Sequence, residues 1–245
     1  ISPWRRAVCG DLTSCLDFAN PNAEAFFSHL PATKATADRA RALSHRTTPP
    51  TPQTITPPVQ EAGLRPRRST PYALEVGAET VGDQVRLTFA NQSSDRAAVF
   101  HVYDRSNLDA VPRRYTVAAG KSLSDTWPAV HDLWVMGPNG FHRHFKGAKA
   151  LVTAKVTTDL VLHNLGPAAI QITVKDEAYG APAQTLTVAA QTDHVMALDL
   201  KASHNWYDLS VIGEGFTQRL AGHIEDGRTS MSDPAAHGSA ILDQA

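Results

Sequence analysis

Hydrophobic and polar side chains alternate repeatedly along residues 71–225. Val85, Leu87 and Phe89, for example, are separated by single polar residues. A period of two with one polar face is typical of antiparallel strands that pack on one side only. Turn-forming sequences separate these segments, namely Asn91-Gln92-Ser93-Ser94, Pro138-Asn139-Gly140, Asn164-Leu165-Gly166-Pro167 and Gly213-Glu214-Gly215. We therefore predict a mainly β fold.

The same pattern occurs twice within this zone, and the matching strings keep their order and nearly constant separation. They are Leu87–Asn91 with Leu160–Asn164, Tyr115–Ala119 with Leu186–Ala190, His131–Gly137 with Tyr207–Gly213, and Phe141–Gly147 with Phe216–Gly222. A repeat of this length predicts two tandem immunoglobulin-like antiparallel β-sandwiches, residues 71–148 and 149–225, each of roughly seven strands. We expect residues 226–245, which are small and polar, to form a flexible tail.

The first 30 residues have a different pattern. Phe26, Phe27 and Leu30 recur at helical spacing, and Asp11 or Thr13 is a candidate cap for an earlier helical turn. Thirty residues cannot form a core alone. We therefore expect a short helical segment that packs on a domain outside this chain.

Residues 31–70 contain seven of the 16 prolines of the chain, with threonines between them. This composition predicts an extended linker that joins no sheet. The linker is also basic, so two interpretations remain. It is a solvated spacer, or its arginines Arg65, Arg67 and Arg68 contact anionic lipid headgroups.

Charge and composition exclude some functions. The formal net charge is -1, which argues against binding of nucleic acid by bulk charge. No apolar run approaches the ~20 residues that span a bilayer. Cys9 and Cys15 are read as two buried thiols or as a disulfide pair.

Catalytic motifs are absent from the sequence: there is no nucleophile elbow, zinc-binding His-Glu-x-x-His helix or P-loop. His142 and His144 share a strand face, so they face solvent or hold a metal if a third ligand approaches. Arg143 lies on the opposite, apolar face, where we expect its head to reach solvent. Asp132 and Asp208 recur in the two copies, and we expect them to bond backbone donors at strand entrances rather than to catalyse. We predict no catalytic residue, metal site or cofactor.

Large aromatic side chains in the β zone could fill a core or touch a membrane, because one end of each is apolar and the other polar. They are Trp127, Trp134, Trp206 and Tyr207. Trp127 and Trp206 lie beside predicted loops and are therefore the preferred candidates for surface contact.

Several long strings resemble a known family. Residues 1–14 and 17–21 look like the end of the catalytic domain of phosphocholine-specific bacterial phospholipases C, which belong with the acid-phosphatase-like phosphoesterases. The β zone resembles their paired C-terminal domains, and the strings that carry this resemblance are Ala98–Asp104, Pro112–Val117, Asp132–Arg143, Trp206–Leu209, Phe216–His223 and Ser232–Pro234.

The resemblance implies an exported hydrolase, secreted or periplasmic, that releases phosphocholine from phosphatidylcholine or sphingomyelin. In that family the metal-binding and nucleophilic residues precede the segment matched here, so none is assigned to a position of this chain. The expected role is an accessory region that supports the catalytic phosphoesterase domain of the parent protein, or that contacts a phospholipid membrane. The alternative is a freestanding binding module, adhesin-like or carbohydrate-binding, because β-sandwiches serve such roles often.

Overall fold

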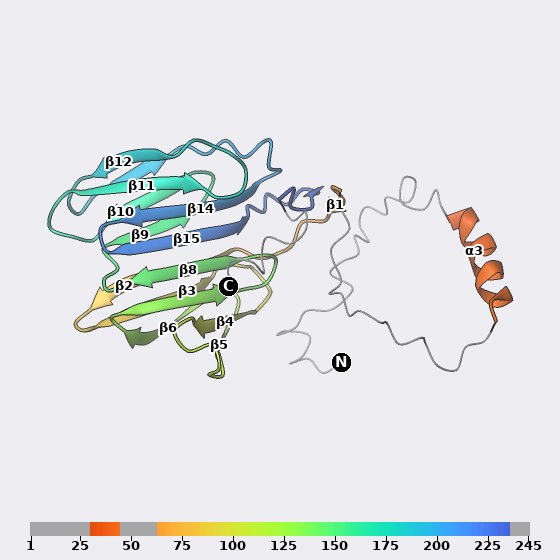
Figure 1. The fold of residues 1–245 in the computed structure, drawn as a ribbon, viewed down its shortest axis with the longest axis horizontal. Helices are drawn as coiled ribbons and strands as arrows, with labels where there is room; N and C mark the ends of the chain where they lie inside the picture. The colour runs from red at the N-terminus through yellow and green to blue at the C-terminus, as the bar shows by residue number, and fades with distance from the viewer. Residues whose placement is uncertain (1–29, 45–62, 236–245) are drawn as a thin grey trace, which may run out of the picture. The chain divides into compact units, whose positions relative to one another are not determined.

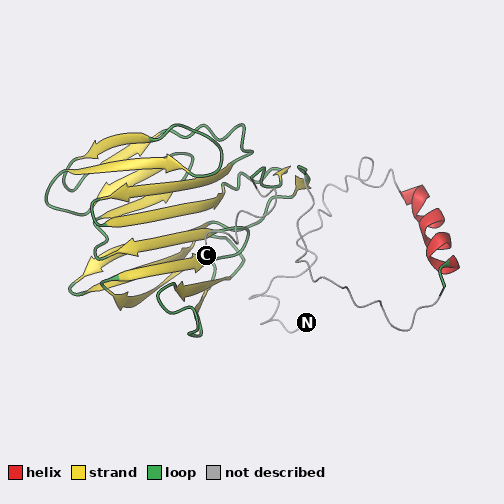
Figure 2. Cartoon of the chain, viewed as in Figure 1, coloured by secondary structure: helices red, strands yellow, loops and turns green. Residues whose placement is uncertain are grey.

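A computed structural model describes residues 30–44 and 63–235 of the chain. Strands dominate this part, and the helix α3 (Leu30–Ala42) precedes them (Figure 1, Figure 2). The helical segment predicted before residue 30, and both cysteines, lie outside the described residues. Within residues 30–44 and 63–235, no helix combines the length and apolar character needed to cross a bilayer.

Helix α3 differs from the extended linker predicted for residues 31–70. Pro31 stands at the start of the helix, where its missing N–H costs little, and alanines follow. Asp38 pairs with Lys34 at 2.9 Å and with Arg41 at 2.8 Å, the spacings that support a helix. The first part of the predicted linker is therefore helical because its prolines are concentrated after Pro49.

The predicted antiparallel β-sandwiches are confirmed, and seven strands form the first repeat. They are β2 (Leu74–Val81), β3 (Gln84–Asn91), β4 (Ala98–Asp104), β5 (Arg113–Val117), β6 (Lys121–Pro128), β7 (His131–Met136) and β8 (His142–Gly147). Strands β2, β3 and β6 form a three-stranded sheet, and the other four lie in the facing sheet.

Seven strands also form the second repeat. They are β9 (Val152–Val156), β10 (Leu160–Asn164), β11 (Ile170–Asp176), β12 (Gln184–Val188), β13 (Asp193–Met196), β14 (Trp206–Gly213) and β15 (Phe216–His223). Here β9, β10 and β13 form the three-stranded sheet, and the other four lie in the facing sheet.

The larger sheets of the two repeats are one continuous layer, which the sequence did not predict. Its strand order is β12-β11-β14-β15-β8-β7-β4-β5, and β15 pairs antiparallel with β8 at the middle. Equivalent strands therefore run in mirrored order from the β8–β15 seam, so an approximate two-fold axis relates the repeats. Gly147 at this seam has φ 149°, and a Cβ there would lie 2.5 Å from the carbonyl oxygen of Gly215.

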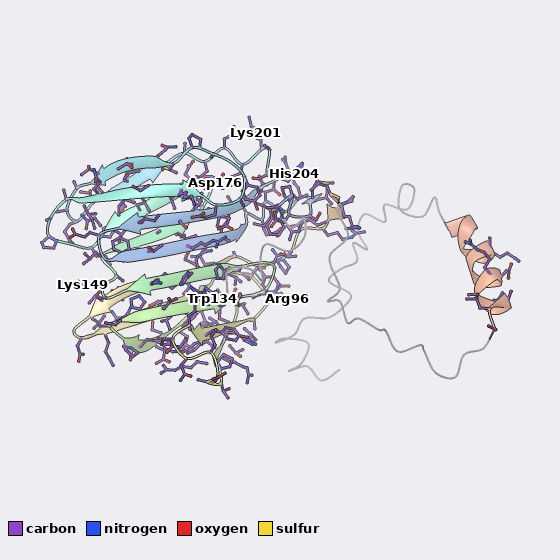
Figure 3. The ribbon with its side chains drawn as sticks, viewed as in Figure 1. Arg96, Trp134, Lys149, Asp176, Lys201 and His204 are labelled. Carbon is purple, nitrogen blue, oxygen red and sulfur yellow. The ribbon has the colours of Figure 1, made fainter. Side chains whose placement is uncertain are left out.

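The connection between the repeats is short and is hydrogen-bonded to β2. Lys149 lies in it (Figure 3), and the next residue, Ala150, donates its N–H to the hydroxyl of Thr80 at 2.8 Å. Strands β2 and β9 of the two smaller sheets lie next to each other. The larger sheets therefore form one hydrogen-bonded layer, whereas the smaller sheets adjoin each other as two separate sheets.

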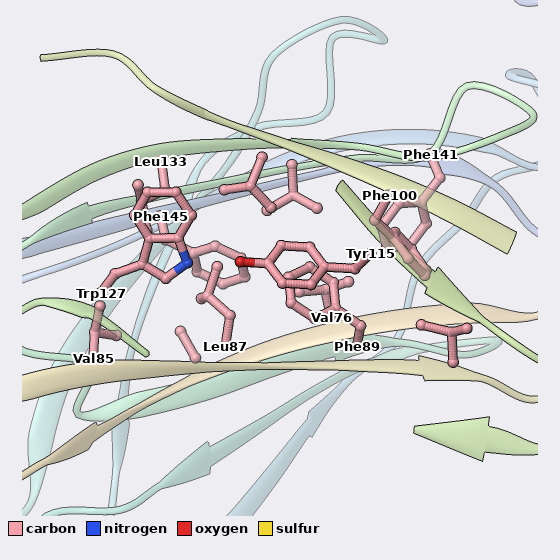
Figure 4. Close-up of a cluster of buried hydrophobic side chains, with 14 of the residues drawn as sticks. Val76, Val85, Leu87, Phe89, Phe100, Tyr115, Trp127, Leu133, Phe141 and Phe145 are labelled. Atoms are coloured by element: carbon pink, nitrogen blue, oxygen red, sulfur yellow. The ribbon is translucent and has the colours of Figure 1, made fainter. Parts of the chain in front are cut away.

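Each repeat nevertheless has its own hydrophobic core. The first core is aromatic: Phe89 stacks on Tyr115 at 4.4 Å and tilts against Phe100 at 5.4 Å (Figure 4). The second core is mostly aliphatic, with Tyr207 and Phe216 as its large rings. The alternating positions predicted to face inward, such as Leu87 and Phe89, are buried.

A small sheet closes the fold where the chain enters and leaves it. Strand β1 (Pro66–Arg67) pairs with β16 (Ser230–Met231), and the N–H of Ser232 donates to the carbonyl of Arg65 at 2.7 Å. This sheet corrects the expectation that the linker joins no sheet, and it places Ser230 and Met231, within the predicted tail 226–245, in a strand. Pro66 is tolerated because it begins a two-residue edge strand.

Candidate functional site

Arg143 of β8 lies at the seam between the repeats, and its side chain is only 1% exposed. Its Nη1 donates to the carbonyl of Ala221 at 3.1 Å, and its Nη2 donates to the hydroxyl of Tyr207 at 3.2 Å. The guanidinium also lies 4.1 Å from the ring centroid of Phe141. The expectation that its head reaches solvent is therefore wrong, because the second repeat covers it.

Glu75 of β2 faces the same guanidinium, with 3.7 Å between its Oε1 and Nη2 of Arg143. Burial raises the pKa of Glu75 above its ordinary value, and the charges of Arg143 and Lys155 only partly oppose that effect. The buried Arg143 and the partly buried Glu75 thus form an ion pair within the first repeat, and Tyr207 and Ala221 of the second repeat cover the guanidinium.

A cavity of about 220 Å³ opens beside this pair. Both repeats line it: Glu75, Asn139 and Phe141 come from the first, and Lys155 and Tyr207 from the second. A polar cavity of this size has room for several waters or a small polar molecule.

A second carboxylate, Glu225, lines the same cavity and collects donors from several segments. We call this the Glu225 cluster. Its donors to Glu225 are Arg67 Nη2 at 2.8 Å, Ser69 Oγ at 3.0 Å, the N–H and hydroxyl of Thr70 at 3.1 Å, Asn139 Nδ2 at 2.7 Å and His223 Nδ1 at 3.2 Å. Burial alone would raise the pKa of Glu225, but these hydrogen bonds hold it well below its ordinary value.

The Glu225 cluster fixes the place where the chain enters the sandwich. Arg67, Ser69 and Thr70 precede β2, whereas Glu225 lies two residues after the end of β15. Its carboxylate therefore holds the incoming segment against the outgoing one, at the end of the first repeat that carries the β7–β8 turn with Asn139.

The outer face of the continuous sheet carries the two histidines considered for metal binding. The rings of His142 and His144 lie 6.4 and 6.2 Å from the ring of Trp134, centroid to centroid, and His144 is the residue directly opposite Trp134 in the register (Figure 3 labels Trp134). His144 Nε2 lies 2.6 Å from Asp132 Oδ1 and is the donor, because a carboxylate only accepts. Within residues 30–44 and 63–235, no three His, Cys, Asp or Glu side chains gather in a way that would hold a metal ion.

Asp132 and Asp208 were expected to bond backbone donors, but both pair with side chains across the strands. Asp132 contacts His144 and Lys146, and Asp208 accepts two hydrogen bonds of 2.7 Å from Arg219. His144 and Arg219 occupy equivalent positions of the repeats. The recurring acid is therefore half of a recurring cross-strand pair.

Three of the five residues predicted to touch a membrane have partners inside the fold. Trp127 is 6% exposed in the first core, which corrects its expected surface position, and Arg113 stacks on it at 3.8 Å. Arg67 binds Glu225, and its guanidinium lies 5.1 Å from the ring centroid of Trp206. Trp206 Nε1 donates to the carbonyl of Met231 at 3.0 Å. Arg65 and Arg68 lie on the same segment and are exposed.

The sequence did not single out Glu75 or Glu225. One signal was available: Arg143 is a charged residue on a face otherwise formed by Phe141 and Phe145. A buried cation needs a partner, so this position already called for an acid nearby. Glu225 gave no such signal, because its donors come from segments far apart in the sequence.

Comparison with known proteins places this architecture in a family. The family model described as "Bacterial phospholipase C, C-terminal domain" matches residues 66–148 and again residues 151–223. The two matches coincide closely with the two seven-stranded repeats.

Three curated relatives match 96% of this chain. A "Non-hemolytic phospholipase C" of Pseudomonas aeruginosa and one of Burkholderia pseudomallei are each 40% identical to it, and the chain covers 37% and 36% of their lengths. A "Hemolytic phospholipase C" of Pseudomonas aeruginosa is 31% identical, with 39% of its length covered. The chain thus spans little more than a third of each of these relatives.

Proposed function

Because the chain belongs to the family of bacterial phospholipase C C-terminal domains, we propose that it is the accessory region of an exported phospholipase C. The parent enzyme would hydrolyse phosphatidylcholine or sphingomyelin and release phosphocholine, and its catalytic part would be the partner of the two repeats. The observation that carries this proposal is the match of 96% of the chain to relatives of which it covers 36–39%.

The architecture supports a role as a rigid support. The eight-stranded sheet runs through both repeats, and the buried Arg143 binds across the seam. The Glu225 cluster anchors the segment that leads into β2. A preceding catalytic part would therefore be attached to one fixed point of a stiff body rather than to two independently moving domains.

The basic segment before β2 supports a second part of the proposal, a contact with phospholipid headgroups. Arg65 and Arg68 flank the anchored Arg67 and would supply the charge. Such a contact weakens with salt, because it is electrostatic.

Adding this chain to a truncated relative tests the accessory role. We expect the 245-residue chain alone to hydrolyse no phosphocholine ester. Added to the Pseudomonas aeruginosa non-hemolytic phospholipase C lacking its matching C-terminal third, it should bind and raise the thermal stability of that catalytic part. An unrelated β-sandwich protein is the control. Turnover by the chain alone, or an absence of binding, would refute the proposal.

A further inference from the structure

Large aliphatic side chains protrude from three connections at one end of the first repeat. Val111 is 80% exposed and Leu108 53% exposed in the β4–β5 connection, and Val130 is 79% exposed between β6 and β7. Val81, also exposed, begins the hairpin between β2 and β3. We call Leu108, Val111 and Val130 the apolar tips.

The connections that carry the tips are held close together. The N–H of Arg105 donates to the carbonyl of Asp132 at 2.8 Å, which joins the β4–β5 connection to the start of β7. Arg113, two residues after Val111, donates to the carbonyl of Thr126 on β6 at 3.0 Å. The apolar tips therefore project from one braced end rather than from independent loops.

The second repeat shows that the fold does not require these exposed side chains. Its corresponding connections are residues 157–159, 177–183 and 197–205. Leu198 and Leu200, the leucines within them, pack against the second core, and no large exposed aliphatic occurs among their described residues. Because an approximate two-fold axis relates the repeats, the corresponding end of the second repeat also faces the opposite direction. Among the described residues, such exposed aliphatic side chains therefore occur on these connections in the first repeat and not on the corresponding connections of the second.

We propose that the apolar tips insert into the interfacial region of a zwitterionic phospholipid bilayer. This inference rests on the proposed function and adds to it a surface that the arginines before β2 do not provide. The tips lie on separate connections, and fluid lipid accepts separate apolar side chains without a matching shape. Shallow burial of apolar side chains at the headgroup boundary is a general mode of membrane binding.

The charges around the tips favour zwitterionic over anionic lipid. Asp83 and Asp109 lie in the β2–β3 and β4–β5 connections, and the exposed Arg114 is the second residue of the edge strand β5. Arg105 pairs with Asp132, and Arg113 pairs with Asp125. No excess positive charge remains at this end, so binding through the tips should depend only weakly on salt.

Sedimentation with phosphatidylcholine vesicles tests the proposal, using the 245-residue chain at low and high salt. We expect binding at both salt concentrations. The triple variant Leu108→Ser, Val111→Ser, Val130→Ser should bind roughly 10–100-fold more weakly. The matched control is Val195→Ser, which removes an exposed valine of β13 in the second repeat and should bind like the wild type.

Circular dichroism and thermal unfolding establish that the variants are folded. A wild-type chain that does not bind phosphatidylcholine vesicles overturns the proposal, as does a folded triple variant that binds unchanged. Binding that high salt abolishes and the triple variant retains would assign the contact to Arg65 and Arg68 instead. The vesicle assay contains no catalytic part, so its failure leaves the accessory role to be decided by its own experiment.

Discussion

Arg143 of the first repeat donates a hydrogen bond to the hydroxyl of Tyr207 in the second, 3.2 Å away. Its equivalent in the second repeat, Gln218, is also buried and donates to the carbonyl of Val152. The seam between the repeats is thus built around buried polar side chains at matching positions. These side chains satisfy backbone and hydroxyl groups that an apolar seam would leave without partners.

Replacing Arg143 by Met should destabilise the fold. The substitution leaves the carbonyl of Ala221 and the carboxyl of Glu75 without their partner, and we expect the free energy of unfolding to fall by about 2–4 kcal/mol. Denaturant unfolding measures the change. Arg114→Met, at an exposed position of β5, is the control and should change stability by less than about 0.5 kcal/mol. A more stable Arg143→Met variant would show that the free-energy cost of burying the guanidinium exceeds the stabilisation from its contacts.

Replacing Glu225 by Gln should lower stability by about 2–4 kcal/mol at neutral pH, because six donor groups of five residues lose a charged acceptor. The lowered pKa of Glu225 means that its contribution is present above the ordinary value of 4.5 and is lost as pH falls through the lowered pKa. The difference in unfolding free energy between wild type and variant should therefore shrink on acidification. Glu214→Gln, on the exposed β14–β15 turn, is the control. A constant difference across the acid range would contradict this assignment.

His142 should make the fold sensitive to mild acid. Burial, together with the charge of Arg219, lowers the pKa of His142 from 6.5 to about 4. The unfolded chain therefore takes up a proton first, and stability present above pH 6.5 is lost as pH falls toward 4, by roughly 1–3 kcal/mol from this residue. His142→Gln should remove that part of the pH dependence in unfolding curves, and His194→Gln should not. Identical slopes for wild type and His142→Gln would rule out this origin.

Gly147→Ala should open the seam between the repeats. The new Cβ would lie 2.5 Å from the carbonyl oxygen of Gly215, at a φ that side chains rarely adopt, so we expect a loss of about 2–3 kcal/mol. Gly77→Ala on β2 is the matched control, because nothing lies within 4 Å of its added Cβ. Thermal unfolding of the Gly147→Ala and Gly77→Ala variants measures the difference. Equal melting temperatures would mean that the seam accommodates the added methyl group.

Much of the fold follows from local patterns. The alternation at Val85, Leu87 and Phe89 predicts a half-buried strand because side-chain direction depends only on neighbouring backbone geometry. The match between the copies predicts two units of equal design. The joining of β8 to β15 was not predictable in this way, because strand pairing between distant segments depends on which edges meet in space.

The candidate site was less predictable for the same reason. Glu225 gathers donors from residues 67–70, 139 and 223, and no short motif connects them. Trp127 and Trp206 lie beside loops as predicted, but proximity to a loop does not decide whether a ring is exposed. The burial of Trp127 depends on how β3 and β6 pack against the facing sheet.

The apolar tips lie beside the start of β7, and the Glu225 cluster lies beside its end. For β2, the Glu225 cluster lies beside the start and the tips beside the end. An eight-residue strand is roughly 26 Å long. A lipid surface touching Val111 and Val130 would therefore stand about one strand length from the point where the chain enters at Arg67. In the proposed arrangement the sandwich would act as a spacer of fixed height, and the length of chain before Arg67 would set how far an attached catalytic domain could reach back to that surface.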